Sequence, residues 1–199
     1  DLWNIFIINN SGIVSGNFAV PNLGPIGAAQ EAQLLLPNLD TDPAKEILLK
    51  APPVSPSSTT NINAYNANGS LVSSWQPVTG TQAQFMYMAI NDSNLDGFDD
   101  VFIANGSVIT LVVTNGGAYS NNLPFIPYQS LAWGIRAVDV NLDSNPEAMV
   151  LYTQTASPTL PVVINNYITA MRVSPTVPGA LISLPGFPLF LSSELFSTS

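Results

Sequence analysis

The sequence predicts an all-β protein made of repeated four-stranded antiparallel blades, and two observations support this fold class. An acidic loop of one shape occurs three times, and an apolar, β-rich run follows each copy at once. The copies start at residues 38, 92 and 139, so their spacings of 54 and 47 residues are typical of repeated structural units. Dipeptides that favour hairpin turns recur between the loops.

The three acidic loops contain ten of the 13 carboxylates of the chain. Each loop has Asp or Asn at its first and third positions, Asp at its fifth, and Asp or Glu at its ninth. Oxygen ligands at alternate positions of a tight loop converge on one point, which suits a hard cation that takes six to eight oxygens at roughly 2.3–2.6 Å. We therefore expect Ca²⁺ as the cofactor. The predicted metal ligands are Asn38, Asp40, Asp42 and Glu46 in the first loop, Asp92, Asn94, Asp96 and Asp100 in the second, and Asp139, Asn141, Asp143 and Glu147 in the third.

An EF-hand is excluded, although it shares the opening of this pattern. Its loop needs a bidentate Glu at the twelfth position, where this chain has Leu49, Ile103 and Val150. The closing acid stands at the ninth position instead. Each loop is therefore expected to lead into a strand and not into a helix.

Each repeat is predicted to contain four strands, with the acidic loop between the first two and a hairpin turn between the last two. Asn68-Gly69 and Asn115-Gly116-Gly117 provide such turns, and Asn10-Ser11-Gly12 provides one before the first complete repeat. The predicted strands are about 31–36, 46–50, 61–66 and 70–75 in the first repeat, 84–90, 101–105, 108–114 and 118–126 in the second, and 132–138, 148–154, 162–173 and 180–184 in the third.

The repeats also define the expected domain organisation. Residues 1–20 form a partial blade or an exchangeable hairpin, and 187–199 begin a further repeat or supply a closing strand. Because a lone two-stranded ribbon leaves its outer edges unpaired, we expect residues 1–18 to pair with 187–199 or with another copy of the chain. The three complete repeats are expected at 21–80, 81–130 and 131–186.

These residues resemble a known family. The loop Asp-Ser-Asn-Leu-Asp-Gly-Phe-Asp-Asp at 92–100 and the hairpin Ile-Asn-Ala-Tyr-Asn-Ala-Asn-Gly-Ser-Leu-Val-Ser-Ser-Trp at 62–75 look like FG-GAP and VCBS-type repeats, which occur in integrin α-chains. The resemblance covers roughly 31–185 and implies β-propeller-like blades, about three complete and two partial, with calcium in the loop between the first two strands. Pro43 and Ser144 stand where the family has Gly, and Asn38 stands where it usually has Asp.

Composition excludes several classes of function. A formal charge of −9 with only four basic residues (Lys45, Lys50, Arg136 and Arg172) provides no basic surface for nucleic acid or an anionic membrane. No apolar run is long enough for a membrane-spanning helix, so membrane insertion is not expected. Cys and His are absent, which removes their metal sites and nucleophiles.

The sequence therefore favours a non-enzymatic protein. The adjacent acids Asp99 and Asp100 are expected to point to opposite faces of a strand, which argues against paired-carboxylate catalysis. Arg136 and Lys45 are expected to neutralise nearby acidic loops. The main prediction is an extracellular, secreted or cell-surface, calcium-stabilised module with a structural or adhesive role, which associates with itself or with another extracellular protein.

Two alternatives remain open at this stage. One is the protomer of an extracellular fibril or pilus-like filament assembled by strand exchange. The other is a polysaccharide-binding or polysaccharide-degrading accessory domain with a glycan as partner. Trp3, Trp75 and Trp133, with Tyr65, Tyr87 and Tyr128, could provide a stacking surface for sugars.

Overall fold

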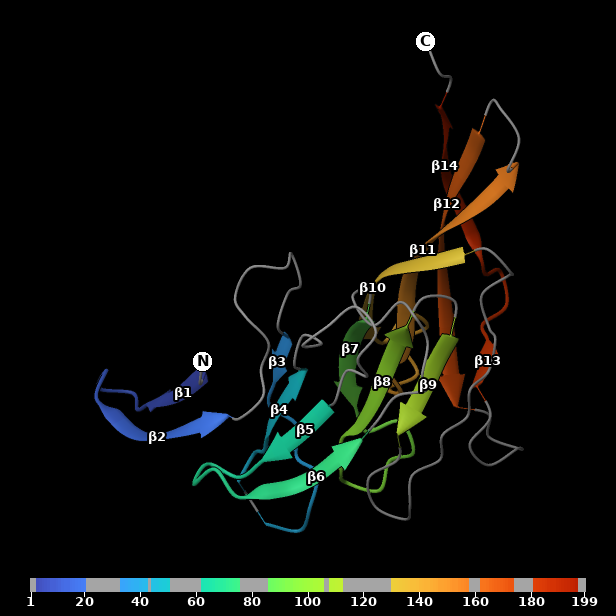
Figure 1. Ribbon diagram of the computed structural model, residues 1–199. Helices are drawn as coiled ribbons and strands as arrows, with labels where there is room; N and C mark the ends of the chain where they lie inside the picture. Colours follow the sequence, from blue (N-terminus) through green and yellow to red (C-terminus); the bar gives the residue numbers. More distant parts are fainter. Residues whose placement is uncertain are drawn as a thin grey trace. The chain divides into compact units, whose positions relative to one another are not determined.

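The computed structural model describes residues 3–20, 33–42, 44–50, 62–75, 86–105, 108–112, 130–157, 162–173 and 181–196, and within these ranges every regular element is a β-strand (Figure 1). The predicted all-β class is confirmed for these residues. No helix there is long and apolar enough to cross a membrane. The chain divides into an N-terminal unit, Asp1–Gln84, and a C-terminal unit, Phe85–Ser199, which we describe separately.

The N-terminal unit contains a two-stranded hairpin and a four-stranded antiparallel sheet in the order β3-β4-β5-β6. The sheet has the strands that were predicted for the first repeat, within two residues at each end. Its acidic loop joins β3 to β4, as expected. The strands of this unit are β1 (Trp3–Ile8), β2 (Val14–Val20), β3 (Gln33–Leu35), β4 (Ile47–Lys50), β5 (Ile62–Tyr65) and β6 (Leu71–Trp75).

One face of the β1–β2 hairpin contributes to a small core with the four-stranded sheet. Val20 is buried with Leu49 and Tyr65, and Ile5 and Phe18 pack against them. The Phe18 and Tyr65 rings lie 5.4 Å apart, centroid to centroid. Residues on one side of each hairpin strand point the same way, so this packing gives the hairpin one covered face.

The β1–β2 and β5–β6 hairpins end in the same turn. The amide of Gly12 donates to the carbonyl of Asn9 at 2.9 Å, and the amide of Gly69 donates to the carbonyl of Asn66 at 2.8 Å. Both glycines have positive φ, 76° and 84°. A turn closed by a residue with positive φ is a common three-residue hairpin connection. Both predicted turns are thus present, whereas the third, at 115–117, lies outside the described residues.

The C-terminal unit contains two antiparallel sheets. In each of them an acidic loop joins the first two strands. The first sheet has the order β7-β8-β9; its predicted fourth strand, at 118–126, lies outside the described residues. The second has the order β10-β11-β12-β13, with β14 paired to β12. The strands are β7 (Met86–Asn91), β8 (Asp100–Asn105), β9 (Val108–Val112), β10 (Ser130–Val138), β11 (Glu147–Ser157), β12 (Val162–Val173), β13 (Leu181–Ser183) and β14 (Leu189–Phe196).

Strand β14 joins the third sheet by pairing with β12. It pairs with residues Val162 to Ile168 of β12, while β13 pairs with Met171 to Val173 of the same strand. The short β13 covers only one end of the long β12, and β14 continues along the remainder. The described part of the C-terminal stretch is therefore a strand of the third sheet.

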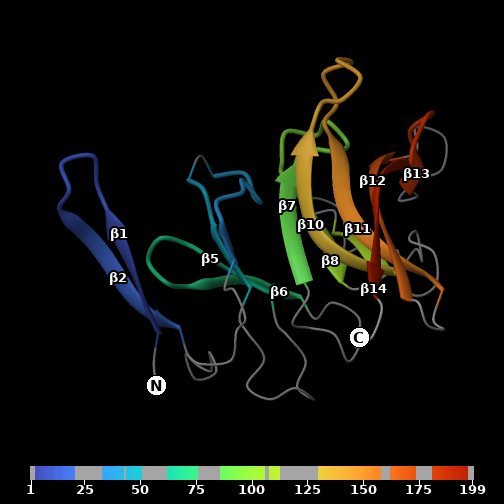
Figure 2. The same ribbon diagram turned by 90° about the horizontal axis from the view of Figure 1, so that it is seen from above.

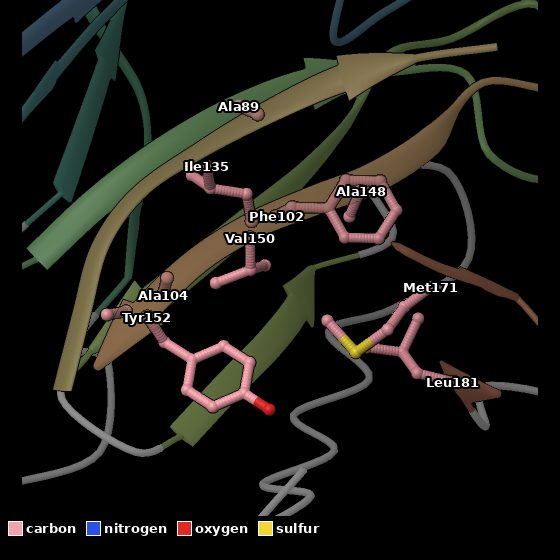
Figure 3. Packing of buried hydrophobic residues seen from close by; sticks show 10 residues of the cluster. Ala89, Phe102, Ala104, Ile135, Ala148, Val150, Tyr152, Met171 and Leu181 are labelled. Carbon is pink, nitrogen blue, oxygen red and sulfur yellow. The ribbon is translucent and has the colours of Figure 1, made fainter. Parts of the chain in front are cut away.

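The two sheets of the C-terminal unit share one hydrophobic core (Figure 3). Phe102 from β8 lies with Ile135 from β10, Val150 and Tyr152 from β11, and Met171 from β12. Strands β7 and β10 lie side by side where the sheets meet (Figure 2). Burial of such side chains contributes about 1.5–3 kcal/mol each, so this core fixes the acidic loops of both sheets within one unit.

Candidate metal-binding loops

The acidic loops occupy equivalent places in the three sheets. The first loop (residues 38–46) joins β3 to β4, the second (92–100) joins β7 to β8, and the third (139–147) joins β10 to β11. All twelve predicted ligands lie on these loops or at the start of the following strand. The repeat spacing seen in the sequence therefore corresponds to one recurring structural position.

The closing acid has the same role in all three loops. Glu46, Asp100 and Glu147 are each 0 % exposed, and each carboxylate accepts a hydrogen bond from the amide of the second residue of its loop. These bonds are Leu39 N to Glu46 Oε2 at 2.5 Å, Ser93 N to Asp100 Oδ2 at 3.0 Å, and Val140 N to Glu147 Oε2 at 2.9 Å. Ser93 Oγ also donates to Asp100. A buried carboxylate needs such donors, so the acid ties each loop to its sheet.

The second and third loops share a further network, in which backbone amides of the loop donate to the Asp and Asn side chains at its first, third and fifth positions. The first Asp of each loop accepts two backbone amides, and the third and fifth positions each accept one. The bonds to the first Asp are Asp96 N to Asp92 Oδ1 at 3.0 Å, Gly97 N to Asp92 Oδ2 at 2.9 Å, Asp143 N to Asp139 Oδ1 at 3.1 Å, and Ser144 N to Asp139 Oδ2 at 2.9 Å.

This network depends on two residues with positive φ in each loop. Leu95 and Gly97 have φ of 59° and 92°, and Leu142 and Ser144 at the equivalent positions have φ of 61° and 70°. Residues with a side chain adopt this region at a cost of about 1–2 kcal/mol. The two loops thus share one backbone conformation, even though only the second has Gly at its sixth position.

The first loop is arranged differently. Carboxylate oxygens of Asp40, Asp42 and Glu46 lie within 4.8 Å of one another, which makes this the one group of three such acids found among the described residues. Asp40 Oδ1 accepts the amide of Asp42 at 2.9 Å, and Asp42 Oδ1 accepts the amide of Ala44 at 2.7 Å, as the third and fifth residues do in the other loops. At the sixth position the sequence has Pro43, which has no N–H. The bond from the sixth amide to the first residue is therefore the part of the network that the first loop cannot form.

Glu46 provides a test of whether a cation fits this group. Its Oε2 accepts the Leu39 amide, but its Oε1, like that of Glu147, is buried and has no hydrogen-bond partner among the described residues. A buried, unpartnered carboxylate oxygen is costly unless a donor or a cation meets it. Since a carboxylate oxygen of each of Asp40, Asp42 and Glu46 lies within 4.8 Å of the others, the group has the hard oxygen donors that Ca²⁺ or Mg²⁺ would take. These residues fit a divalent cation, and they do not by themselves select calcium.

A positively charged side chain lies beside the third loop, and the sequence analysis did not predict it. Arg172 on β12 places Nη1 3.4 Å from Asp143 Oδ2. The pKa of the Asp143 carboxyl is lowered by the hydrogen bond from the amide of Asn145, and also by the Asn141 side chain and the Arg172 charge. Arg136, which was expected to neutralise a nearby acidic loop, donates to the Ile135 carbonyl at 2.8 Å. No local pattern links Arg172 to Asp143, because 29 residues separate them.

Three further residues that the sequence analysis considered differ in how far they are buried. Asp99 is half-buried beside the fully buried Asp100. Tyr65 is buried in the N-terminal core, so it cannot stack against a sugar. Trp133 is 46 % exposed on β10, and its indole Nε1 donates to Thr153 Oγ1 at 3.0 Å.

Comparison with known proteins leaves the family open: no family model, no curated protein and no solved structure matches this chain.

Proposed function

We propose that this protein is a non-enzymatic, extracellular, calcium-stabilised β-repeat module with a structural or adhesive role. Each sheet, with its acidic loop, would act as one blade of a propeller-like array. The observation that carries the proposal is the first loop, where three carboxylates converge and the buried Oε1 of Glu46 has no hydrogen-bond partner. Asp40, Asp42 and Glu46 would hold the ion, and the ion would supply the positive charge that these acids require.

Bound calcium would stabilise the fold by mass action. An ion that binds only the native state adds RT ln(1 + [L]/Kd), about 2.7 kcal/mol at a hundredfold excess over Kd. The first loop joins β3 to β4, so this gain would appear in the N-terminal unit. Extracellular calcium modules have Kd values of about 0.1–1 mM, so a site of that affinity would stabilise the fold only where calcium reaches such concentrations.

Thermal unfolding with calcium, with magnesium and with a strong chelator tests this proposal. We expect the highest Tm in calcium and a lower Tm in chelator, and an Asp42→Ala variant should show no difference between these two conditions. Asp99→Ala is the matched control, because Asp99 lies outside the group of three acids. An unchanged Tm of the wild-type chain in chelator would contradict the proposal.

Self-assembly through the N-terminal hairpin is a second candidate function, favoured by the uncovered face of that hairpin. Phe6, Ile8, Ile13 and Val14 are all more than half exposed, and neither β1 nor β2 contains a charged residue. Charges on edge strands are a usual protection against strand addition. A second copy of this chain is the partner we propose, because β14 presents the same chemistry, with Leu189, Phe190 and Leu191 about half exposed.

Light scattering after size-exclusion chromatography tests this assembly. Ile8→Lys should reduce the assembled fraction, since it places a charge on the exposed face. Ser11→Lys, which adds the same charge at an exposed position of the turn, outside the strand face, is the matched control. Deletion of 1–18 should also remove assembly, although it uncovers Leu49 and Tyr65 and should lower stability as well. A wild-type chain that stays monomeric at all concentrations would rule this candidate out.

A further inference from the structure

The chain contains four Asn-x-Ser sequences, and the structure gives three of them different surroundings. This tripeptide is the acceptor of N-linked glycosylation, in which the Asn side-chain amide receives the sugar. The four copies begin at Asn9, Asn68, Asn91 and Asn105. The first two lie in the turns of the β1–β2 and β5–β6 hairpins, and the third begins at the end of β7. Residues 106–107 of the fourth lie outside the described part of the chain.

The side chain of Asn9 directs its nitrogen away from the turn. Its Oδ1 accepts the backbone amides of Ser11 and Ile13, both at 3.0 Å. Because only the oxygen of a side-chain amide can accept these bonds, Nδ2 lies on the other side of the planar group. Asn9, Asn10 and Ser11 are all exposed. The nitrogen that would receive the sugar and the Ser hydroxyl of the tripeptide are therefore both accessible.

Asn68 has the same arrangement in the second hairpin. Its Oδ1 accepts the backbone amide of Ser70 at 2.9 Å, and both residues are exposed. The Oγ of Ser70 accepts Nδ2 of Asn66 at 3.1 Å, which leaves the hydroxyl proton of Ser70 for another acceptor. The two turns thus present one acceptor geometry twice.

Asn91 uses the equivalent groups to hold the fold together. It is half-buried, and its Nδ2 donates to the carbonyl of Pro146 at 3.1 Å, which links the end of β7 to the third loop. The hydroxyl of Ser93 donates to the buried Asp100. A sugar on this nitrogen would have to fit beside the Pro146 carbonyl, so the third loop would have to move. The fold therefore distinguishes this tripeptide from the two in the hairpin turns.

We propose that Asn9 and Asn68 are N-glycosylation sites of this protein and that Asn91 is not. The inference rests on the extracellular location in the proposed function, because N-glycosylation acts on exported chains. The donor is an oligosaccharide linked to a lipid through pyrophosphate. Asn Nδ2 bonds to C1 of the first sugar, the bond between C1 and the pyrophosphate oxygen breaks, and lipid pyrophosphate leaves. One amide proton passes to a base of the transferase.

Secretion of the full chain behind a leader peptide from a eukaryotic cell tests these sites, because such cells contain the donor and the transferase. Treatment with peptide-N-glycosidase in heavy-oxygen water converts each glycosylated Asn to a labelled Asp, which mass spectrometry locates by peptide. We expect the label at Asn9 and Asn68 and none at Asn91. The secreted chain and the chain retained in the cell are both measured, so poor export does not hide the result.

Matched variants assign each glycan to its tripeptide. Asn9→Gln should remove the mass of one glycan from the chain, whereas Asn10→Gln, which keeps the Asn-x-Ser pattern beside it, should remove none. In the second hairpin, Ser70→Ala should remove one glycan although Asn68 is still present, and Ser70→Thr should retain it. All of these residues are exposed, so the changes probe the acceptor pattern and not the core.

The proposal is overturned if neither turn carries a glycan in either fraction, or if Asn91 is labelled as fully as Asn9 and Asn68. A glycan on one turn alone overturns the assignment of the other. Tm measurements of the unglycosylated chain in calcium and in chelator keep this result separate from the calcium proposal. A calcium effect without glycans refutes only the glycosylation sites, and glycans without a calcium effect refute only the calcium site.

Discussion

The first and third acidic loops have the same ligand spacing but use their carboxylates in different ways. In the third loop, Asp139 and Asp143 accept amides of the loop itself, and Arg172 supplies a positive charge. In the first loop, Asp40, Asp42 and Glu46 each accept one backbone amide, like their counterparts in the third loop, but their carboxylate oxygens lie within 4.8 Å of one another. The shared pattern fixes where acids occur, and the loops differ in whether those acids converge.

This difference reverses the order of the loops that the sequence favoured. The second loop matches the family pattern best, with Gly97 at its sixth position, yet its acids are the most fully hydrogen-bonded by the loop. In the second loop the amide of the sixth residue donates to the first acid, Asp92, whereas Pro43 has no N–H and the first residue of the first loop is Asn38. Because the three acids of the first loop converge, we expect the largest effect of calcium there.

The largest expected effect distinguishes Glu46, the closing acid of the first loop, from Glu147, the closing acid of the third. Glu46→Gln should abolish the calcium-dependent stabilisation, about 2.7 kcal/mol at a hundredfold excess of calcium, because it removes the ligand charge at the group of three acids. In chelator the same variant should be as stable as wild type or more stable, since it also removes a buried charge.

Chemical denaturation in calcium and in chelator measures this effect, with Glu147→Gln as the matched control. Glu147 is equally buried and accepts the equivalent amide, but it lies outside the group of converging acids. Equal loss of the calcium effect in both variants would show that the two loops do not differ.

A smaller effect is expected from Gly97→Ala. No atom lies within 4 Å of the added Cβ, so only the backbone conformation, with φ of 92°, opposes the change. The cost should be roughly 1–2 kcal/mol of unfolding free energy, measured by denaturation in chelator. A variant as stable as wild type would show that the network of the second loop does not depend on this conformation.

Ser144→Gly changes the equivalent position of the third loop, and here we expect stability to rise and not to fall. Ser144 has φ of 70°, so Gly relieves about 1–2 kcal/mol of strain but adds about 0.5–1 kcal/mol of backbone entropy in the unfolded chain. The net expectation is a gain of about 0.5 kcal/mol, from the difference of these terms, in the same denaturation experiment. A loss of stability would mean that the serine side chain has a role of its own.

The smallest expected effect is the pH dependence of the third loop. The folded pKa of Asp143 is lowered, first by the Asn145 amide, below the ordinary value of 3.8. Its contribution to stability is therefore complete above about 3.8 and is lost as the pH falls through the lowered pKa. In chelator, Asp143→Asn should flatten this acid limb slightly, and the carboxyl carbon of Asp143 should titrate below an unfolded reference. A titration at or above that reference would contradict the pKa assignment.

Local pattern predicted much of the fold and only part of the site. The strands around the acidic loops and the turns ending in Gly12 and Gly69 were predicted, because both depend on neighbours in sequence. The pairing of β14 with β12 was missed, because it depends on the short β13 leaving part of β12 uncovered. The role of Arg172 was missed because it depends on tertiary contact with Asp143.

One available sequence signal was overlooked. The third strands of two sheets share Ile-Asn-x-Tyr, at 62–65 and 164–167, and in both the Asn amide donates to the hydroxyl of the Tyr two residues later. The distances are 3.1 Å for Asn63 to Tyr65 and 3.3 Å for Asn165 to Tyr167. This match aligns the third strands of the first and third repeats independently of the acidic loops.

The two identical turns differ in how freely they can change over evolutionary time. A Cβ at Gly69 would lie 2.6 Å from the Cβ of Phe18, whereas a Cβ at Gly12 would meet no atom within 4 Å. Substitutions at Gly69 are thus opposed by both backbone and packing, while Gly12 is limited by its backbone alone. Asn and longer insertions can accumulate in the outer turn without disturbing the core, and the same turn is the natural place to attach a fluorophore or fuse a peptide tag.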